Sequence, residues 1–158
     1  MLSNLITDRT LTDFNRWLYL RDKWYANMTA SERAEWETDM KGAYNASDLN
    51  RVGAVLNYLR DRLADAAYIS NNAFKMRENW QKNEIPTAAE FSAYINAVAM
   101  IRNAMAQKRT TPPAPANNGS LDWQSANNIE QIMLDIDELI TKMLSARHFC
   151  GDLFSGEI

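Results

Sequence analysis

Apolar residues recur at helical spacing in three long stretches of the chain. In the clearest stretch, leucine and valine alternate by three and four residues from Leu49 to Leu63. This spacing places the apolar side chains on one helix face, a seam that needs partner helices to bury it. Asn45 or Ser47 suits the start of this helix as an N-cap, and Asp48 follows in the first turn, where the helix dipole favours negative charge.

Two further long helices are predicted from the same periodicity. Thr87 and Glu90 form a capping-box pattern, and apolar residues then line one face as far as Met105. The final helix is expected over about residues 122–147, with a wide stripe of isoleucine, leucine and methionine. This last helix cannot bury its stripe alone, so it has to return to the same core or pair with another chain.

Two shorter helices are predicted near the beginning of the chain. Thr10 suits the N-cap of the first one, which carries aromatic residues at helical spacing as far as Tyr25. The sequence of residues 29–32 is a capping box, and it predicts a short second helix carrying Trp36 and Met40.

The connections differ in character. Residues 68–84 have no clear period and are expected to form a loop, with a short strand near residues 75–80 as an alternative. Residues 108–120 contain three prolines and a glycine, which predict an extended, partly polyproline crossover inside one domain. The chain is therefore expected to be all-α: a single domain over residues 1–158, built as an antiparallel bundle of four to five helices.

Composition narrows the classes of function. The chain has 158 residues, a formal net charge of −3 and a pI of about 5.2, and an acidic balance argues against a general phosphate-binding surface. Its single cysteine excludes an intramolecular disulfide. It has no run of 18 apolar residues and no signal-peptide pattern, so we expect a soluble protein with no membrane contact, made in the cytoplasm.

Catalytic patterns are scarce, and we expect neither an enzyme nor a bound cofactor or metal. One histidine cannot supply multi-histidine metal sites, and no glycine-rich phosphate loop or nucleophile elbow is present. His148 and Cys150 allow a nucleophile pair, but a terminal packing pair is the favoured interpretation. Asp135 and Glu138, three residues apart, are more simply the solvated face of the last helix than a cation site.

The first helix mixes basic and aromatic residues, a combination that can hold phosphates and stack bases. Its basic residues are Arg9, Arg16, Arg21 and Lys23. Nearby aspartates nearly cancel their charge, and the aromatic residues fall at core spacing. Packing is therefore favoured over nucleic-acid binding for this helix.

The stretch MKGAYNASDLNRVG, residues 40–53, is unusually polar. The residues of interest in it are Gly42, Tyr44, Asn45, Ser47, Asp48 and Arg51. Gly42 suits the end of the preceding helix, and the polar residues suit the start of the next. Capping does not explain Tyr44 or Arg51, and Arg51 is spaced to pair with Asp48 or with a carboxylate elsewhere. A structural turn that carries a buried polar anchor is favoured over a small-molecule site.

Several stretches, taken in order, resemble a module that recurs in structural proteins of phages and prophages of Firmicutes, usually among tail-associated genes. They are DRT (8–10), RW (16–17), MTASERAEW (28–36), MKGAYNASDLNRVG (40–53), IPT (85–87), TTPPAP (110–115), DWQSANNIEQIMLDIDELI (122–140) and GDLFSGEI (151–158). The resemblance covers nearly the whole chain, and residues 40–53 and 122–140 are its most specific parts. In the module a more β-like segment with a Trp precedes IPT, whereas NNAFKMRENW here is less β-prone.

The resemblance implies a non-enzymatic virion protein of the tail or baseplate, made in the bacterial host cytoplasm. Its partners would be other phage tail or virion proteins and further copies of itself. Five Trp, six Tyr and eight Met fit such contacts, and Trp17, Trp24 and Trp123 are the candidate interface residues. The alternative is a prophage-encoded cytoplasmic helical adaptor or nucleic-acid-binding regulator.

Overall fold

The computed structural model describes residues 2–117 and 121–152, with side chains described as far as residue 146. The α-helices are α1 (Leu11–Asp22), α2 (Ala30–Trp36), α3 (Ala46–Asp65), α4 (Ala88–Asn103) and α5 (Trp123–Asp152). Two short 3₁₀ turns, η1 (Leu2–Asn4) and η2 (Tyr25–Asn27), accompany them. Residues 2–117 and 121–152 contain no β-strand. The all-α prediction is confirmed.

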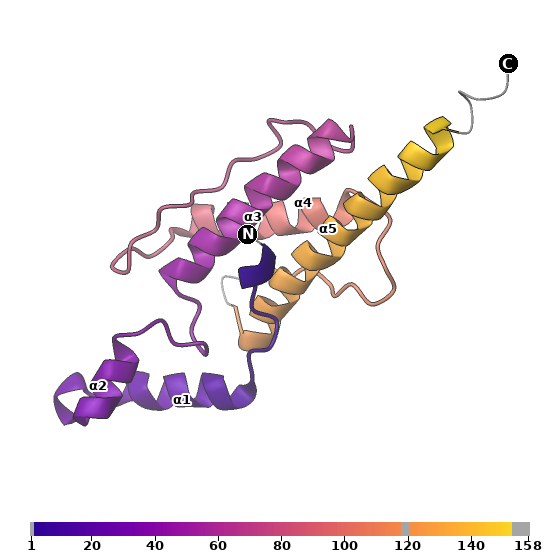
Figure 1. Cartoon of the computed structure of the whole chain (residues 1–158). Coiled ribbons are helices and arrows are strands. Elements are labelled where there is room, and N and C mark those ends of the chain that lie inside the picture. Colours follow the sequence, from indigo (N-terminus) through magenta and orange to yellow (C-terminus); the bar gives the residue numbers. More distant parts are fainter. Residues whose placement is uncertain (1, 118–120, 153–158) are drawn as a thin grey trace, which may run out of the picture.

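The three long helices form the main core. α3, α4 and α5 each pack against the other two; α3 and α5 run side by side in the same direction, and α4 crosses them (Figure 1). The predicted seam from Leu49 to Leu63 is buried, and Val52, Leu56 and Leu59 along it are fully enclosed. The α5 stripe, which includes Ile129, Met133 and Ile136, closes the same core from the other side. The final helix therefore returns to the core of its own chain.

The two shorter helices form a separate hairpin, which we call the arm (residues 10–40). The arm stands off the three-helix core at one end of the molecule (Figure 1). It has a small apolar core of its own, in which Leu20, Met28 and Met40 are buried. Trp17 and Trp36 pack against these three side chains. The five helices are thus distributed between a main core and an arm.

The predicted helix starts are confirmed. Thr10, Thr29 and Thr87 each accept a hydrogen bond from the amide three residues on, and the acidic residue there bonds back to the cap amide. Such reciprocal bonds satisfy donors that every helix start leaves open. Local sequence is enough to fix these positions because both partners lie within four residues.

Four predicted helix ends are wrong; two are those of α4, which ends at Asn103 before Met105, and of α5, which runs to Asp152. α1 ends at Asp22 because Lys23 is extended, so Tyr25 belongs to η2 and not to α1. α2 ends at Trp36, and the Thr38 hydroxyl then donates to the Glu35 carbonyl at 2.6 Å. Met40 therefore lies outside α2, although its side chain still enters the arm core.

The strand considered near residues 75–80 is not formed. Residues 74–80 instead make an extended strap along α3. The Asn57 side chain donates to the Met76 carbonyl at 2.9 Å and accepts from the Met76 amide at 2.8 Å. The Asn50 side chain likewise donates to the Trp80 carbonyl at 2.9 Å and accepts from the Trp80 amide at 2.6 Å. Two side-chain amides supply the bonds that a neighbouring strand would otherwise supply, so the strap is extended without a sheet.

Gly53 lies between these two asparagines on α3, where the strap passes closest. A Cβ atom built on Gly53 would lie 2.5 Å from the Arg77 carbonyl oxygen. Gly53→Ala should gain about 1 kcal/mol of helix propensity but lose about 1–3 kcal/mol to the steric conflict. We expect net destabilisation in urea melts followed by circular dichroism. A more stable variant would mean that the strap is not held this closely.

Candidate functional site

Four charged side chains meet between the helices, and we call them the polar anchor. One Arg9 guanidinium nitrogen lies 2.8 Å from Asp48 Oδ1 and 2.7 Å from Glu130 Oε1. Arg51 bonds the same Glu130 oxygen at 3.0 Å and also pairs with Asp48. The Glu130 side chain is completely buried, and that of Arg9 is 1% exposed. Two cations and two carboxylates therefore neutralise one another away from solvent.

The anchor joins parts of the chain that are far apart in sequence. Asp48 and Arg51 are one turn apart at the start of α3, Glu130 is on α5, and Arg9 directly precedes the arm. The pairing of Arg51 with Asp48 that the spacing of three predicts is present. Burial alone lowers the pKa of the Arg51 guanidinium, but its bonds and charges with Glu130 and Asp48 outweigh burial and raise that pKa.

The segment before the arm is bound to α5 by further hydrogen bonds. Glu130 accepts from the Ile6 amide at 2.5 Å. The Asn127 side chain accepts from the Arg9 amide at 3.0 Å and donates to the Arg9 carbonyl at 2.9 Å. The Arg9 side chain in turn donates to the Ile6 carbonyl at 2.7 Å. The entry to the arm is thus fixed by both backbone and side-chain contacts.

A tyrosine pair brings α4 into the same region. The hydroxyl groups of Tyr44 and Tyr94 are hydrogen-bonded, and the rings meet edge to face with centroids 6.4 Å apart. The Arg9 guanidinium lies 5.7 Å from the centre of the Tyr44 ring. Burial raises the pKa of both hydroxyls, so both tyrosines stay neutral. Tyr44 and Arg51, the two residues that capping does not explain, both belong to this buried polar region.

The other residues of the turn form the start of α3 or allow the turn to contact α1. The Asn45 amide donates to Asp48 at 2.8 Å, and the Asn45 side chain donates to the Met40 carbonyl at 2.9 Å. Asn45 is therefore the N-cap of α3, and Ser47 lies in its first turn, partly buried. The expectation for Gly42 is wrong, because α2 ends well before it. A Cβ atom at Gly42 would lie 2.0 Å from the Asp13 carbonyl oxygen, so this residue permits the turn to touch α1.

The three candidate interface tryptophans have different surroundings. Trp24 is 81% exposed, at the tip of the arm. Trp17 is partly buried against the arm core, with the Arg21 guanidinium 5.0 Å from its ring centre. Trp123 is partly buried and shares with Trp17 a small cavity of about 60 Å³ at the joint between the arm and α5. Only Trp24 of these three presents most of its side chain to solvent.

The tip of the arm gathers several exposed aromatic side chains. Tyr19 and Tyr25 are about half exposed there, beside Trp24. A groove of about 370 Å³ runs between α1 and α2 at this tip, and Leu20 and Met28 contribute to its lining. The tip is therefore a mixed surface, in which exposed aromatic rings lie among the charged residues Arg21, Asp22 and Lys23.

The basic residues near the first helix are paired with carboxylates, whereas Arg33 of α2, 5.2 Å from the Tyr25 ring centre, donates to the Tyr25 and Ala26 carbonyls. Besides Arg9 in the anchor, Arg16 pairs with Glu35 at 2.6 Å. Arg21 pairs with Asp22, and Lys23 pairs with Glu32, each at 2.8 Å. The basic and aromatic pattern of the first helix thus has its cations already paired within the chain.

Glu32 holds the two helices of the arm together. Lys23 donates to it, the Tyr19 hydroxyl donates at 3.2 Å, and the Thr29 amide donates at 2.7 Å. These bonds, that of Lys23 above all, lower the pKa of Glu32 to about 2.

A pH dependence of the arm follows from this shift. Because the folded pKa is the lower one, the stabilisation is present above the unfolded value of about 4.3 and is lost as the pH falls toward 2. Glu32→Gln should destabilise the arm at neutral pH, and its difference from the wild type should vanish near pH 2. Acid titration of tryptophan fluorescence for both proteins measures this difference. A difference that does not change with pH would contradict the assignment.

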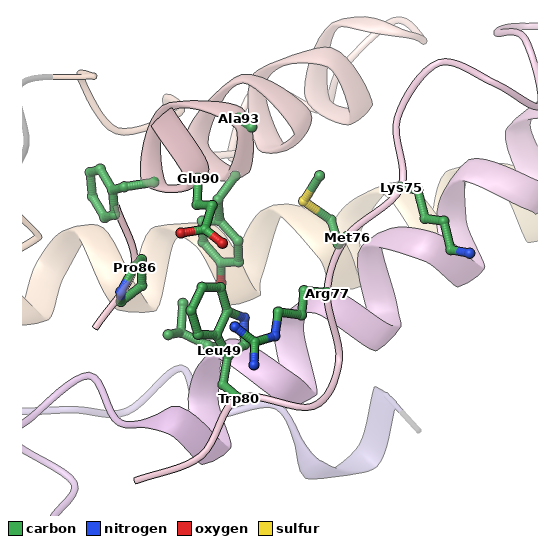
Figure 2. A pocket seen from close by; sticks show the side chains of 10 residues that line it. Leu49, Lys75, Met76, Arg77, Trp80, Pro86, Glu90 and Ala93 are labelled. Atoms are coloured by element: carbon green, nitrogen blue, oxygen red, sulfur yellow. The ribbon is translucent and has the colours of Figure 1, made fainter. Parts of the chain in front are cut away.

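A second pocket, the strap pocket, lies between the strap and α4 (Figure 2). Its volume is about 250 Å³, and Leu49, Met76 and Tyr94 form part of its apolar lining. The Arg77 guanidinium is stacked on the Trp80 ring, 4.2 Å from its centre, at the rim. Figure 2 shows Glu90 reaching from α4 toward the same space.

The interpretation of the acidic pair as a solvated face of α5 is wrong for Asp135, whereas Glu138 is exposed as expected. Asp135 is buried and accepts from the Thr111 hydroxyl at 2.7 Å and from the Gln131 side chain at 3.0 Å. Glu138 pairs with Lys108, and this bond is the main reason that its pKa falls to about 2. Both carboxylates therefore hold the connection after α4 onto α5.

The described side chains give little support to a nucleophile pair or a metal site. The side chains of His148 and Cys150 lie outside the described residues. Among the side chains that are described, no three acidic, histidine or cysteine groups are placed to hold a metal ion. None of the helices in the described ranges is long and apolar enough to cross a membrane.

The sequence did not identify Arg9 and Glu130 as members of the polar anchor. Nor did it identify Asn50 and Asn57 as the residues that bond the strap. One feature of the sequence could have identified Glu130: it is a charged residue directly beside Ile129 on the apolar stripe. No such feature distinguishes Arg9 from the other basic residues near the first helix. Comparison with known proteins gives no match to a family model, to a curated protein or to a solved structure.

Proposed function

We propose that this chain is a non-enzymatic structural protein of a phage virion, associated with the tail or baseplate. It acts through protein–protein assembly contacts with other virion proteins and with further copies of itself. The observation that carries this proposal is the arm, a helical hairpin that stands off the main core and carries Trp24, 81% exposed, between α1 and α2. Exposed tryptophan is the residue type most often found at the energetic centre of protein interfaces.

The polar anchor supports the same role. An assembly subunit has to present its contact surface in a fixed direction, since each imprecise contact is repeated in every copy. Arg9 and Glu130 fix the entry of the arm on α5, and Gly42 fixes the turn that leaves it. The arm is therefore suited to be a rigid projection.

The assignment to a virion rests on the resemblance of residues 40–53 and 122–140 to the phage tail-associated module. In this structure the first stretch contributes Asp48 and Arg51 to the anchor, and the second contributes Glu130. The most specific stretches are thus those that set the position of the arm. A virion protein of this kind is made in the host cytoplasm and carried in the particle.

A second candidate is a prophage-encoded cytoplasmic helical adaptor or nucleic-acid-binding regulator. The exposed aromatic residues of the arm tip favour it, since bases stack on such rings. Phosphate binding also needs available cations, and Arg16, Arg21 and Lys23 are paired. A salt-dependent gel shift separates the two candidates. Binding that weakens steeply with salt would favour the regulator, and no binding at low salt would exclude nucleic acid.

Antibody labelling of purified particles tests the first candidate. The particles are those of the phage or induced prophage whose genome encodes this chain, viewed in negative stain with gold-labelled antibody. We expect gold at the tail or baseplate. The control uses particles carrying a deletion of the gene, or unlabelled serum where the deletion yields none. Gold that is absent, or that is confined to host debris, would contradict the proposal.

A further inference from the structure

We propose that the chain assembles head to tail, with Trp24 of one copy inserted into the strap pocket of the next. This inference rests on the proposed function and deepens it by naming the two surfaces and the partner, a second copy of the chain. The arm tip and the strap pocket are parts of every copy, but they lie on different parts of the molecule: one on the arm, the other on the main core (Figure 1).

The chemistry of the strap pocket matches an indole side chain. Its volume of about 250 Å³ leaves room for one indole ring, and its lining combines the partly buried Phe91 with the largely buried Trp80 and Tyr94. The exposed Arg77 guanidinium is held at its edge by Glu84 and lies with one face on Trp80, so its other face can take an incoming ring. The lining therefore favours a flat, electron-rich group over a purely aliphatic one.

The pocket also has an acceptor for the single donor of an indole. One oxygen of Glu90 accepts from the Thr87 amide at 2.8 Å and from the Thr87 hydroxyl at 2.7 Å. The other oxygen makes no hydrogen bond with the described part of the chain, and the carboxylate is exposed. A tryptophan ring N–H is a donor only, so a carboxylate oxygen at the pocket is its natural partner.

Trp24 is the residue of this chain best placed to be the occupant. It is the tryptophan with 81% of its surface exposed, and it lies at the end of a projecting hairpin. Burying the large apolar surface of an indole ring is favourable, and Trp24 does not bury it within its own chain. A pocket on another copy supplies that burial. The polar anchor holds the arm in place, so little ordering is required on association.

A contact between two different surfaces of the same chain is heterologous. Repetition of it closes into a ring when the rotation between copies permits, and otherwise extends as an open chain. A cyclic contact of this type suits the rotational symmetry of a tail. In a closed ring every copy uses its arm once and its pocket once, whereas an open chain leaves one arm and one pocket free at its ends.

Two single variants remove one side of the contact each. Trp24→Ala deletes the occupant, and Ala93→Arg places a long side chain at the pocket on an exposed position of α4, where arginine suits a helix. Each variant should self-associate at least about 30-fold more weakly than the wild type, the loss expected when a central interface residue is truncated. Leu11→Ala, which truncates an exposed apolar residue at the start of α1, is the matched control on the same arm and should associate normally.

The decisive experiment mixes the two variants in equal amounts, with mass followed by size-exclusion chromatography and light scattering. The intact pocket of Trp24→Ala can take the intact Trp24 of Ala93→Arg, so the mixture should form dimers and nothing larger. Circular dichroism melts check that both variants fold as the wild type does. A wild type that is monomeric, a Trp24→Ala variant that assembles normally, or a mixture that stays monomeric would each overturn the inference.

Failure here is distinguishable from failure of the proposed function. A chain that is found in particles but shows no complementation in the mixture retains the virion role and loses this contact. A chain that assembles through Trp24 but is absent from particles retains the contact and loses the virion role. The two experiments use different samples and report different quantities.

Discussion

Glu130→Ala is expected to destabilise the fold by about 3–5 kcal/mol, the cost of breaking a buried ion pair by removing one partner. Glu130 is completely buried and receives bonds from both arginines of the polar anchor, Arg9 and Arg51, and from the Ile6 amide. Its removal leaves two guanidinium groups with Asp48 as their only carboxylate in the anchor. Urea melts followed by circular dichroism measure the free energy of unfolding directly.

A second carboxylate on the same helix provides the control. Glu138 lies two turns further along α5 and pairs with Lys108 and Lys142 at an exposed position. Exposed pairs of this kind contribute little to stability. Glu138→Ala should therefore change the free energy of unfolding far less than Glu130→Ala. Equal effects of the two substitutions would show that the anchor does not stabilise the fold as its burial implies.

Leu56→Ala and Ile136→Ala should each cost about 2–5 kcal/mol, because each leaves a cavity in the main core. Leu56 is at the middle of the α3 seam and Ile136 at the middle of the α5 stripe, and both are fully enclosed. Leu144→Ala, on a more exposed part of α5, is the control and should change stability by about 0.5 kcal/mol or less. Urea melts that give less than about 1 kcal/mol for both core variants would contradict this packing.

The helix starts and the main seams could be predicted because their causes are local. Thr10, Thr29 and Thr87 each find their capping partner three residues away. The α3 seam likewise follows from the spacing of Leu49 to Leu63 alone. Where both partners of a contact lie within a few residues of each other, a local sequence pattern is enough to predict the contact.

The features that sequence reasoning got wrong have distant causes. α2 ends before Met40, and Gly42 serves a contact with Asp13 on α1 that no local pattern reveals. The strap is part of the expected loop, but its extended course along α3 is set by Asn50 and Asn57, which bond its backbone. Propensity describes the segment, but tertiary partners decide its conformation.

The site was predictable only in part, for the same reason. The local turn marked Tyr44 and Arg51 as residues that capping does not explain, and the spacing of Arg51 from Asp48 gave one of its two partners. Glu130 lies 79 residues beyond Arg51, and no spacing rule could choose it among the carboxylates of α5.

The protein content of purified particles tests the central claim most directly. Gradient-purified virions of the encoding phage, analysed by quantitative mass spectrometry, should contain this chain in a constant ratio to the other virion proteins across independent preparations. Particles assembled with the Trp24→Ala chain should contain less of it, whereas the Leu11→Ala chain should be retained. Absence of the wild-type chain from purified particles would contradict a structural role in the virion.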